Sequence, residues 1–193
     1  PETFETTIDG ESARRCVEGA EGAHLEGFTL LDGFIGGSGG GLFNIDVSMT
    51  VSHVVFRSCS AGISGGALFS SGAATVSVFE DCRFEDNQSG NPIGGGVTSL
   101  SGGESTFLRC VFVRNTTLDL GGAALVGNAV ATFEDCAFLE NEALEGGALS
   151  NDAQSEVHLV RCVFGGNTAT TTGGAIINAG ELTARNCSFT GNA

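Results

Sequence analysis

The sequence predicts an all-β fold, a parallel β-helix in which each coil takes about 26 residues. Three observations lead to this prediction. One motif recurs at nearly constant spacing, a glycine pair follows every copy but the last, and the remaining part of each copy holds polar turn residues instead of a helical pattern.

The motif reads F-x-x-C-x-F-x-x-N and is followed, after four residues, by the glycine pair; its clearest copy occupies residues 133–148. The second Phe recurs at positions 56, 84, 112, 138, 164 and 189, in steps of 28, 28, 26, 26 and 25 residues. A period in this range is typical of solenoids. Because the chain has 193 residues, we expect one domain of about seven coils.

The domain divides into an opening coil, residues 1–35, and the repeats, residues 36–193. Residues 6–10 predict a strand that ends in an Asp-Gly turn, and residues 25–31 predict a second strand. Each repeat offers a strand after the glycine pair, one that enters F-x-x-C and one through C-x-F, so we expect three strands per coil. Because residues 192–193 stop where the next glycine pair is due and no polar cap closes the stack, we expect a segment of a longer array.

A leucine-rich repeat is the main alternative, because L-x-x-L-x-L-x-x-N has the same spacing. Its horseshoe needs a helical segment in each repeat. Residues 146–157 hold a glycine pair and polar turn residues in that place, which favours the β-helix.

Each motif position predicts a row of side chains stacked from coil to coil. One Phe row should stack in the interior, where ring contacts add about 0.5–1.5 kcal/mol each beyond burial; a second row (Phe79, Phe107 and Phe133, with Leu159) should form another wall. The asparagines should lie at a turn and bond their own backbone or the Asn one coil away. The first Phe row is Phe56, Phe84, Phe112, Phe138, Phe164 and Phe189, and the Asn row is Asn87, Asn115, Asn141 and Asn167.

Five of the seven cysteines form another row: Cys82, Cys110, Cys136, Cys162 and Cys187. In-register Cβ atoms one strand spacing apart, roughly 4.8 Å, are slightly too distant for an easy disulfide. We therefore expect buried free thiols. Cys16 and Cys59 lie outside the row, and their redox state stays open.

The charge balance excludes some partners. Eight arginines, no lysine and 23 acidic residues give a net charge of -15, which argues against nucleic acid and anionic membranes. No apolar run reaches the length of a membrane-spanning helix, so we expect no direct membrane insertion.

The acidic residues near the motif suggest a Ca²⁺ site, but the position before Cys alternates acid and base in successive copies. It reads Asp81, Arg109, Asp135 and Arg161. Ca²⁺ requires six to eight converging oxygens, and a row interrupted by Arg supplies them poorly. We predict instead a charge ladder that fixes the register between coils, with no metal and no cofactor.

Catalytic patterns are absent from the sequence. It lacks G-x-S-x-G and H-E-x-x-H, and its three histidines fall in different slots without acidic partners nearby in sequence. It also lacks Trp and Tyr, the usual platforms for sugars. A threonine slot (Thr50, Thr106, Thr132, Thr183) hints at ice binding, but Val78 and His158 interrupt it.

The alternating signatures G-G-A-[ILV] and F-x-x-N resemble the repeats of the polymorphic outer membrane protein family, as at residues 65–68, 146–149 and 173–176. Residues 7–10 (TIDG) and 27–30 (GFTL) resemble the first coil of secreted, right-handed β-helix proteins of the pectin-lyase-like class. The looser copies are residues 94–97 and 121–124, and Cys59 interrupts the Asn row. The resemblance spans nearly the whole chain and implies a right-handed β-helix, an extracellular or cell-surface location and a role in adhesion. It transfers no catalytic residue.

The sequence therefore predicts a non-catalytic, structural or adhesive β-helix. Its expected partners are further coils or another protein chain at the open ends, and a host or matrix surface. The alternatives are a polysaccharide lyase or hydrolase-like enzyme and, third, an ice-binding protein.

Overall fold

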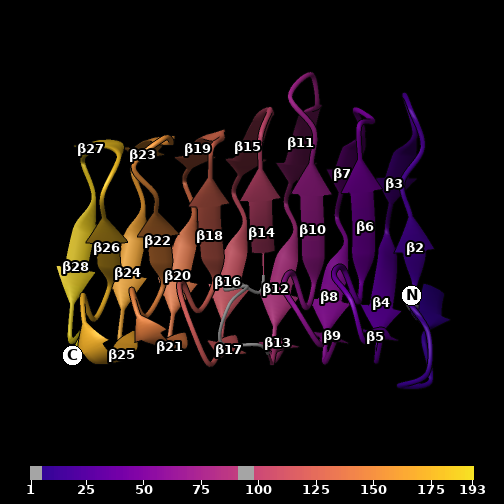
Figure 1. Cartoon of the computed structure of the whole chain (residues 1–193), viewed down its shortest axis with the longest axis horizontal. Coiled ribbons are helices and arrows are strands. Elements are labelled where there is room, and N and C mark those ends of the chain that lie inside the picture. Colours follow the sequence, from indigo (N-terminus) through magenta and orange to yellow (C-terminus); the bar gives the residue numbers. More distant parts are fainter. Residues whose placement is uncertain (1–5, 91–97) are drawn as a thin grey trace, which may run out of the picture.

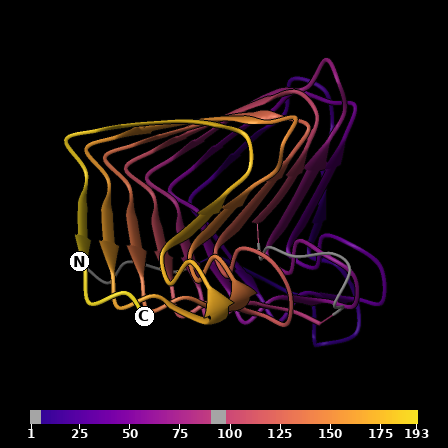
Figure 2. The same cartoon turned by 60° about the vertical axis from the view of Figure 1, so that its left-hand side comes forward.

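A computed structural model describes residues 6–90 and 98–193 of the chain, and within them it confirms the parallel β-helix. The coils stack side by side, with β1 at one end and β28 at the other (Figure 1). Successive coils repeat nearly the same outline when seen obliquely along the stack (Figure 2). The described residues contain no helix, which excludes the leucine-rich repeat for this part of the chain.

Four parallel sheets, which we name A to D, run along the stack. Sheet A has eight strands and sheet B seven. Sheet A consists of β1 (Thr6–Asp9), β4 (Phe28–Leu31), β8 (Val55–Arg57), β12 (Arg83–Glu85), β16 (Val111–Val113), β20 (Ala137–Leu139), β24 (Val163–Gly165) and β28 (Ser188–Thr190). Sheet B consists of β2 (Val17–Glu18), β6 (Leu42–Ile45), β10 (Leu68–Ser71), β14 (Thr98–Ser101), β18 (Ala124–Gly127), β22 (Leu149–Asn151) and β26 (Ile176–Asn178).

Sheets C and D have seven and six strands. Sheet C consists of β3 (His24–Glu26), β7 (Thr50–Ser52), β11 (Val76–Glu80), β15 (Glu104–Leu108), β19 (Val130–Glu134), β23 (Glu156–Val160) and β27 (Glu181–Arg185). Sheet D consists of β5 (Phe34–Ile35), β9 (Ser60–Ala61), β13 (Gln88–Ser89), β17 (Thr116–Thr117), β21 (Glu142–Glu145) and β25 (Thr168–Thr172). From β4 onward, each coil passes through sheets A, D, B and C in that order.

The prediction of three strands per coil is wrong, because sheet D adds a fourth strand. Its first four strands have two residues each, too few for an apolar period. They form because the turn after the Asn row stacks closely enough for backbone pairing: the Gln88 amide donates to the Cys59 carbonyl at 2.9 Å, and Thr116 donates to Asn87 at 3.0 Å. The strand expected at residues 25–31 is also divided, because Gly27 bends the chain with φ of 73°.

Equivalent positions of the sequence repeat pair with one another in the sheets. Phe56, Phe84 and Phe112 are direct neighbours in sheet A, and the later members of the row continue the pairing. Parallel rings in this row lie 4.5–4.8 Å apart between centroids, which matches the spacing of strands in a sheet. The second row packs edge-on against the first, as Phe107 does against Phe112 at 5.6 Å. Both rows are buried as far as Phe164.

Single residues in the left-handed region bend each coil between sheets C and A. Asp81, Arg109, Asp135 and Arg161 have φ of 52°, 52°, 55° and 53°. A left-handed residue turns the chain sharply. These four residues therefore occupy the same bend in successive coils.

Glycine is required where neighbouring coils approach most closely. A Cβ on Gly147 would lie 2.3 Å from the Gly174 carbonyl oxygen and 2.6 Å from that of Thr168. Both atoms belong to the backbone of the next coil and have little freedom to move. The glycine pairs thus set how tightly the coils stack.

Candidate functional site

The Asn row forms a continuous ladder of hydrogen bonds inside the stack. Asn115 Nδ2 donates to Asn141 Oδ1 at 3.0 Å and to the Phe84 carbonyl at 2.9 Å, and its backbone amide donates to the same Asn141 Oδ1 at 3.1 Å. The pattern recurs from Asn87 to Asn192. Asn87, Asn115, Asn141 and Asn167 are at most 1% exposed. Their amide groups therefore bind neighbouring coils and not an external ligand.

The Cys row lies at the start of the sheet A strands, and the Asn ladder follows their ends. Cys82, Cys110, Cys136 and Cys162 are buried, and Cys187 in the last coil is half-buried; all are free thiols. Each of the buried sulfurs donates to a backbone carbonyl of the preceding coil, as Cys110 Sγ does to Phe79 O at 3.5 Å. Contacts with Cys136 and Cys82, together with burial, raise the pKa of Cys110 well above its ordinary value. Buried free thiols of this kind serve as small core side chains.

The alternating charges occupy one bend and resolve into pairs. Arg109 donates to both carboxylate oxygens of Asp81, at 2.8 and 2.9 Å, and also contacts Glu80. Arg161 repeats this arrangement with Asp135, at 2.7 and 2.8 Å, and with Glu134. Each Arg reaches back to the preceding coil, so each pair links two neighbouring coils.

A second set of charges follows the second Phe of the motif. Glu85 is 7% exposed and accepts hydrogen bonds from Arg57 and Arg83. Burial raises the pKa of Glu85, but the two arginines outweigh that effect, so the net pKa is lowered. Arg114 holds both oxygens of Asp86 at 2.8 Å. The sequence did not predict the cluster around Glu85. Its formation requires two arginines from neighbouring coils to converge on one carboxylate.

The charge pairs predict a loss of stability in acid. Hydrogen bonds from Arg109 and Arg161 hold the pKa of Asp81 and Asp135 below the usual value. A carboxyl group with a depressed folded-state pKa stabilises the fold above its unfolded pKa, about 3.9. That contribution disappears as the pH falls through the lower folded-state pKa. The double variant Arg109→Gln/Arg161→Gln should therefore have a lower thermal midpoint at pH 7 and a shallower decline between about pH 4 and pH 2.

Thermal unfolding followed by circular dichroism at several pH values checks this prediction. Arg185→Gln is the matched control, because Arg185 has no ion-pair partner within the described residues. High salt should reduce the difference between the double variant and the parent chain. Equal acid sensitivity of parent and double variant would contradict the ladder.

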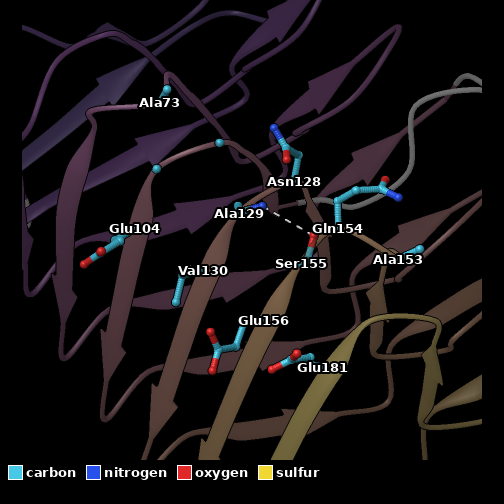
Figure 3. Close-up of a pocket in the computed structure, with 12 residues that line it drawn as sticks. Ala73, Glu104, Asn128, Ala129, Val130, Ala153, Gln154, Ser155, Glu156 and Glu181 are labelled. Atoms are coloured by element: carbon cyan, nitrogen blue, oxygen red, sulfur yellow. Dashed lines mark hydrogen bonds between the residues drawn. The ribbon is translucent and has the colours of Figure 1, made fainter.

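A groove of about 530 Å³ lies where sheet B turns into sheet C (Figure 3). The Glu156 and Glu181 side chains lie next to each other on its border, with Glu104 on the other side of Val130 (Figure 3). These four residues are in-register neighbours on β15, β19, β23 and β27. The groove therefore presents carboxylates from alternate and adjacent coils.

Ser155 is the hydroxyl-bearing residue of the groove, and its hydrogen bonds are structural. Its Oγ contacts Asp152, donates to the Val126 carbonyl at 3.1 Å and accepts from the Ala129 amide at 3.4 Å. The side chain is buried. None of the described residues that line the groove is His, Lys, Arg or Cys, so Ser155 has no histidine, lysine or cysteine beside it in this set.

The prediction that the histidines occupy different slots without acidic partners nearby in sequence is wrong. His24 and His158 share one outer column of sheet C, together with Thr50, Thr106 and Thr132. His158 Nε2 lies 3.2 Å from Glu156 Oε1, and His24 lies 3.8 Å from Glu26. The signal was present in the sequence, because residues two apart on a strand share a face.

His158 also connects the column to the next coil. Its Nδ1 lies 2.8 Å from Thr183 Oγ1. Thr132, His158 and Thr183 line a second groove of about 360 Å³. The threonine slot is thus a real column on sheet C, interrupted by Val78 and by histidines at two positions.

Neither groove contains a set of metal ligands in the described part of the chain. Within residues 6–90 and 98–193, no group of three or more His, Cys, Asp or Glu side chains is arranged to hold a metal ion. In the same residues, no helix has the length and apolar character needed to cross a membrane.

Comparisons with known proteins agree with this architecture. Residues 40–193 match the family described as a right handed beta helix region. The chain belongs to this family. The β-helix is also similar to the metabotropic glutamate receptor-like protein R of Dictyostelium discoideum, with 31% identity over 139 residues. The aligned part is 71% of this chain and 8% of that protein, so the β-helix spans a small part of its relative. No solved structure matches the chain with comparable significance.

Proposed function

We propose that this β-helix is a rigid, non-catalytic segment of an extracellular or cell-surface protein, with a structural or adhesive role. One observation carries the proposal: the side chains that the motif repeats are used between coils. Both Phe rows fill the core, and the amides of the Asn row bond to one another. The paired charges bridge coils on the outside. The repeated chemistry thus builds a stiff stack.

Three further observations support the location and the partners. The alternating G-G-A-[ILV] and F-x-x-N signatures favour the polymorphic outer membrane type of repeat, and the Dictyostelium relative is named receptor-like. A net charge of -15 suits contact with a basic host or matrix surface. Further coils or another protein chain are the other partners that we propose.

Staining of cells that make the full-length protein tests the location. An antibody against this segment should stain intact, non-permeabilised cells. Staining that requires permeabilisation would overturn the proposed extracellular location. Binding of the purified segment to basic matrix proteins should weaken as salt increases, and undiminished binding at high salt would contradict an acidic wall as the contact surface.

A polysaccharide-cleaving enzyme is the second candidate, and the in-register pair Glu156 and Glu181 beside the groove favours it. Paired carboxylates are the usual acid and nucleophile or base of glycoside hydrolysis. We expect no new reducing ends or unsaturated products from a panel of acidic and neutral polysaccharides, with Ca²⁺ or with chelator. Cleavage that Glu156→Gln/Glu181→Gln abolishes and Glu104→Gln retains would replace our proposal with this one.

Ice binding is the third candidate and rests on the threonine column. Val78 and His158 interrupt the column, and we expect no thermal hysteresis in solutions of the segment. Measurable hysteresis that Thr106→Val/Thr132→Val removes would establish this candidate.

A further inference from the structure

Cys16 and Cys59 meet at the N-terminal end of the stack, although 43 positions separate them in the sequence. Cys16 Sγ donates to the Leu31 carbonyl and Cys59 Sγ to the Leu30 carbonyl, each at 3.4 Å. The two sulfurs therefore contact consecutive peptide groups at the end of β4.

Gly33 makes room for this contact. Phe34 pairs with Ser60, so Gly33 is the neighbour of Cys59 in the preceding coil. A Cβ on Gly33 would lie 2.9 Å from Cys16 Sγ. The sulfur of Cys16 thus takes the place that a side chain at position 33 would occupy, directly beside Cys59.

Cys59 stands where the Asn ladder ends. Its backbone amide donates to Asn87 Oδ1 at 2.9 Å, as an Asn in this slot would. Toward the preceding coil, the Cys59 thiol donates to the Leu30 carbonyl, where an Asn side chain would donate its amide. The neighbouring thiols also act on each other: Cys59 lowers the pKa of Cys16, and Cys16, together with burial, raises the pKa of Cys59.

This pair differs geometrically from the Cys row. Members of the row hold the same position, just before the sheet A strand, in successive coils. Their backbones are therefore roughly 4.8 Å apart, whereas a disulfide needs Cβ atoms about 3.5–4.5 Å apart. Cys16 precedes β2, in sheet B, and Cys59 precedes β9, in sheet D. The strand register that keeps the row apart does not hold these two side chains parallel.

We propose that Cys16 and Cys59 form a disulfide by exchange with a small-molecule disulfide such as oxidised glutathione. The thiolate of Cys16, which is half-buried, attacks the glutathione disulfide and releases one glutathione thiolate. The thiolate of Cys59 then attacks the Cys16 sulfur of the mixed disulfide and releases the second. Two protein thiols are oxidised, one glutathione disulfide is reduced, and the two protons of the protein thiols end on the two released glutathione thiolates.

The bond would fasten the opening coil to the repeats. Cys16 lies between β1 and β2, and Cys59 lies between β8 and β9. The link closes a long loop, which restricts the unfolded chain. Oxidation should therefore raise the thermal midpoint by about 5 °C or more, and a reductant should reverse the shift.

Mass spectrometry of the purified chain tests the proposal. After treatment with oxidised glutathione, unfolding and alkylation, five of the seven thiols should be alkylated, and the mass should show the loss of two hydrogens without bound glutathione. Trypsin cleaves at Arg15, Arg57 and Arg83 and thereby separates residues 16–57 from residues 58–83. We expect these two peptides to be joined.

Variants identify the second sulfur, because residues 58–83 contain both Cys59 and Cys82. Cys82→Ser should retain the link, and Cys59→Ser and Cys16→Ser should each lose it. No link in the parent chain, glutathione that remains bound to Cys16, or a link that survives in Cys59→Ser would overturn the proposal. The parent and Cys82→Ser results decide the matter even if Cys59→Ser fails to fold.

Discussion

Phe112→Ala should lower the free energy of unfolding by about 3–5 kcal/mol. The ring is fully buried and stacks on Phe84 and Phe138, with centroids 4.7 and 4.8 Å apart. It also meets Phe107 and Phe133 edge-on, at 5.6 and 6.0 Å. Removing it leaves a cavity between two rigid neighbours that cannot collapse without breaking the register of sheet A. Urea unfolding followed by circular dichroism measures the change.

Phe189→Ala is the matched control, because it makes the same substitution in the same row. Phe189 is 50% exposed and stacks on Phe164 at 4.7 Å. We expect a loss below about 1.5 kcal/mol, since the ring buries only part of its surface. Equal losses in the two variants would show that the ring stack does not carry the core.

The Phe, Asn and Cys rows were predictable because their residues repeat at one period. In a solenoid the same slot in successive copies becomes a column, so the spacing of Phe56 and Phe84 in the sequence already indicates their contact. The alternation of Asp81 and Arg109 was readable for the same reason. The sequence does not show, however, that each Arg reaches back to the preceding coil, because the choice depends on side-chain direction at the bend.

The bends themselves carried a signal that the prediction did not use. The slot before Cys holds Asp, Arg or Asn in the later copies and His53 in an early one, all with positive φ. No β-branched residue occurs in this slot, as expected where a left-handed backbone would clash with a branched Cβ. This absence predicts the bend between sheets C and A.

Features that do not depend on the repeat could not be predicted from the sequence. Cys16 belongs to the opening coil, which has no second copy in the chain, so no periodicity relates it to Cys59. Their contact depends on Gly33, whose missing side chain leaves the space. The groove beside Glu156 and Glu181 likewise results from the shape of the turns between sheets B and C.

Asn141→Ala should lower the free energy of unfolding by about 3 kcal/mol or more. Its Oδ1 accepts from the backbone amide and Nδ2 of Asn115, at 3.1 and 3.0 Å. Its Nδ2 donates to Phe112 O at 3.0 Å and to Asn167 Oδ1 at 2.9 Å. Alanine leaves these partners buried without their bonds, and each unsatisfied buried group costs about 1–3 kcal/mol. Urea unfolding measures the loss, and amide exchange at Asn115 should accelerate.

Asn192→Ala removes the same side chain from the last rung of the ladder. Asn192 Oδ1 accepts from Asn167 Nδ2 at 2.8 Å, and its Nδ2 donates to Phe164 O at 3.0 Å. Because Asn192 is half-buried, water can replace these bonds, and we expect a loss of about 1 kcal/mol or less. If Asn141→Ala is no more destabilising than Asn192→Ala, the ladder is a consequence of the stacked coils and not one of the interactions that hold them together.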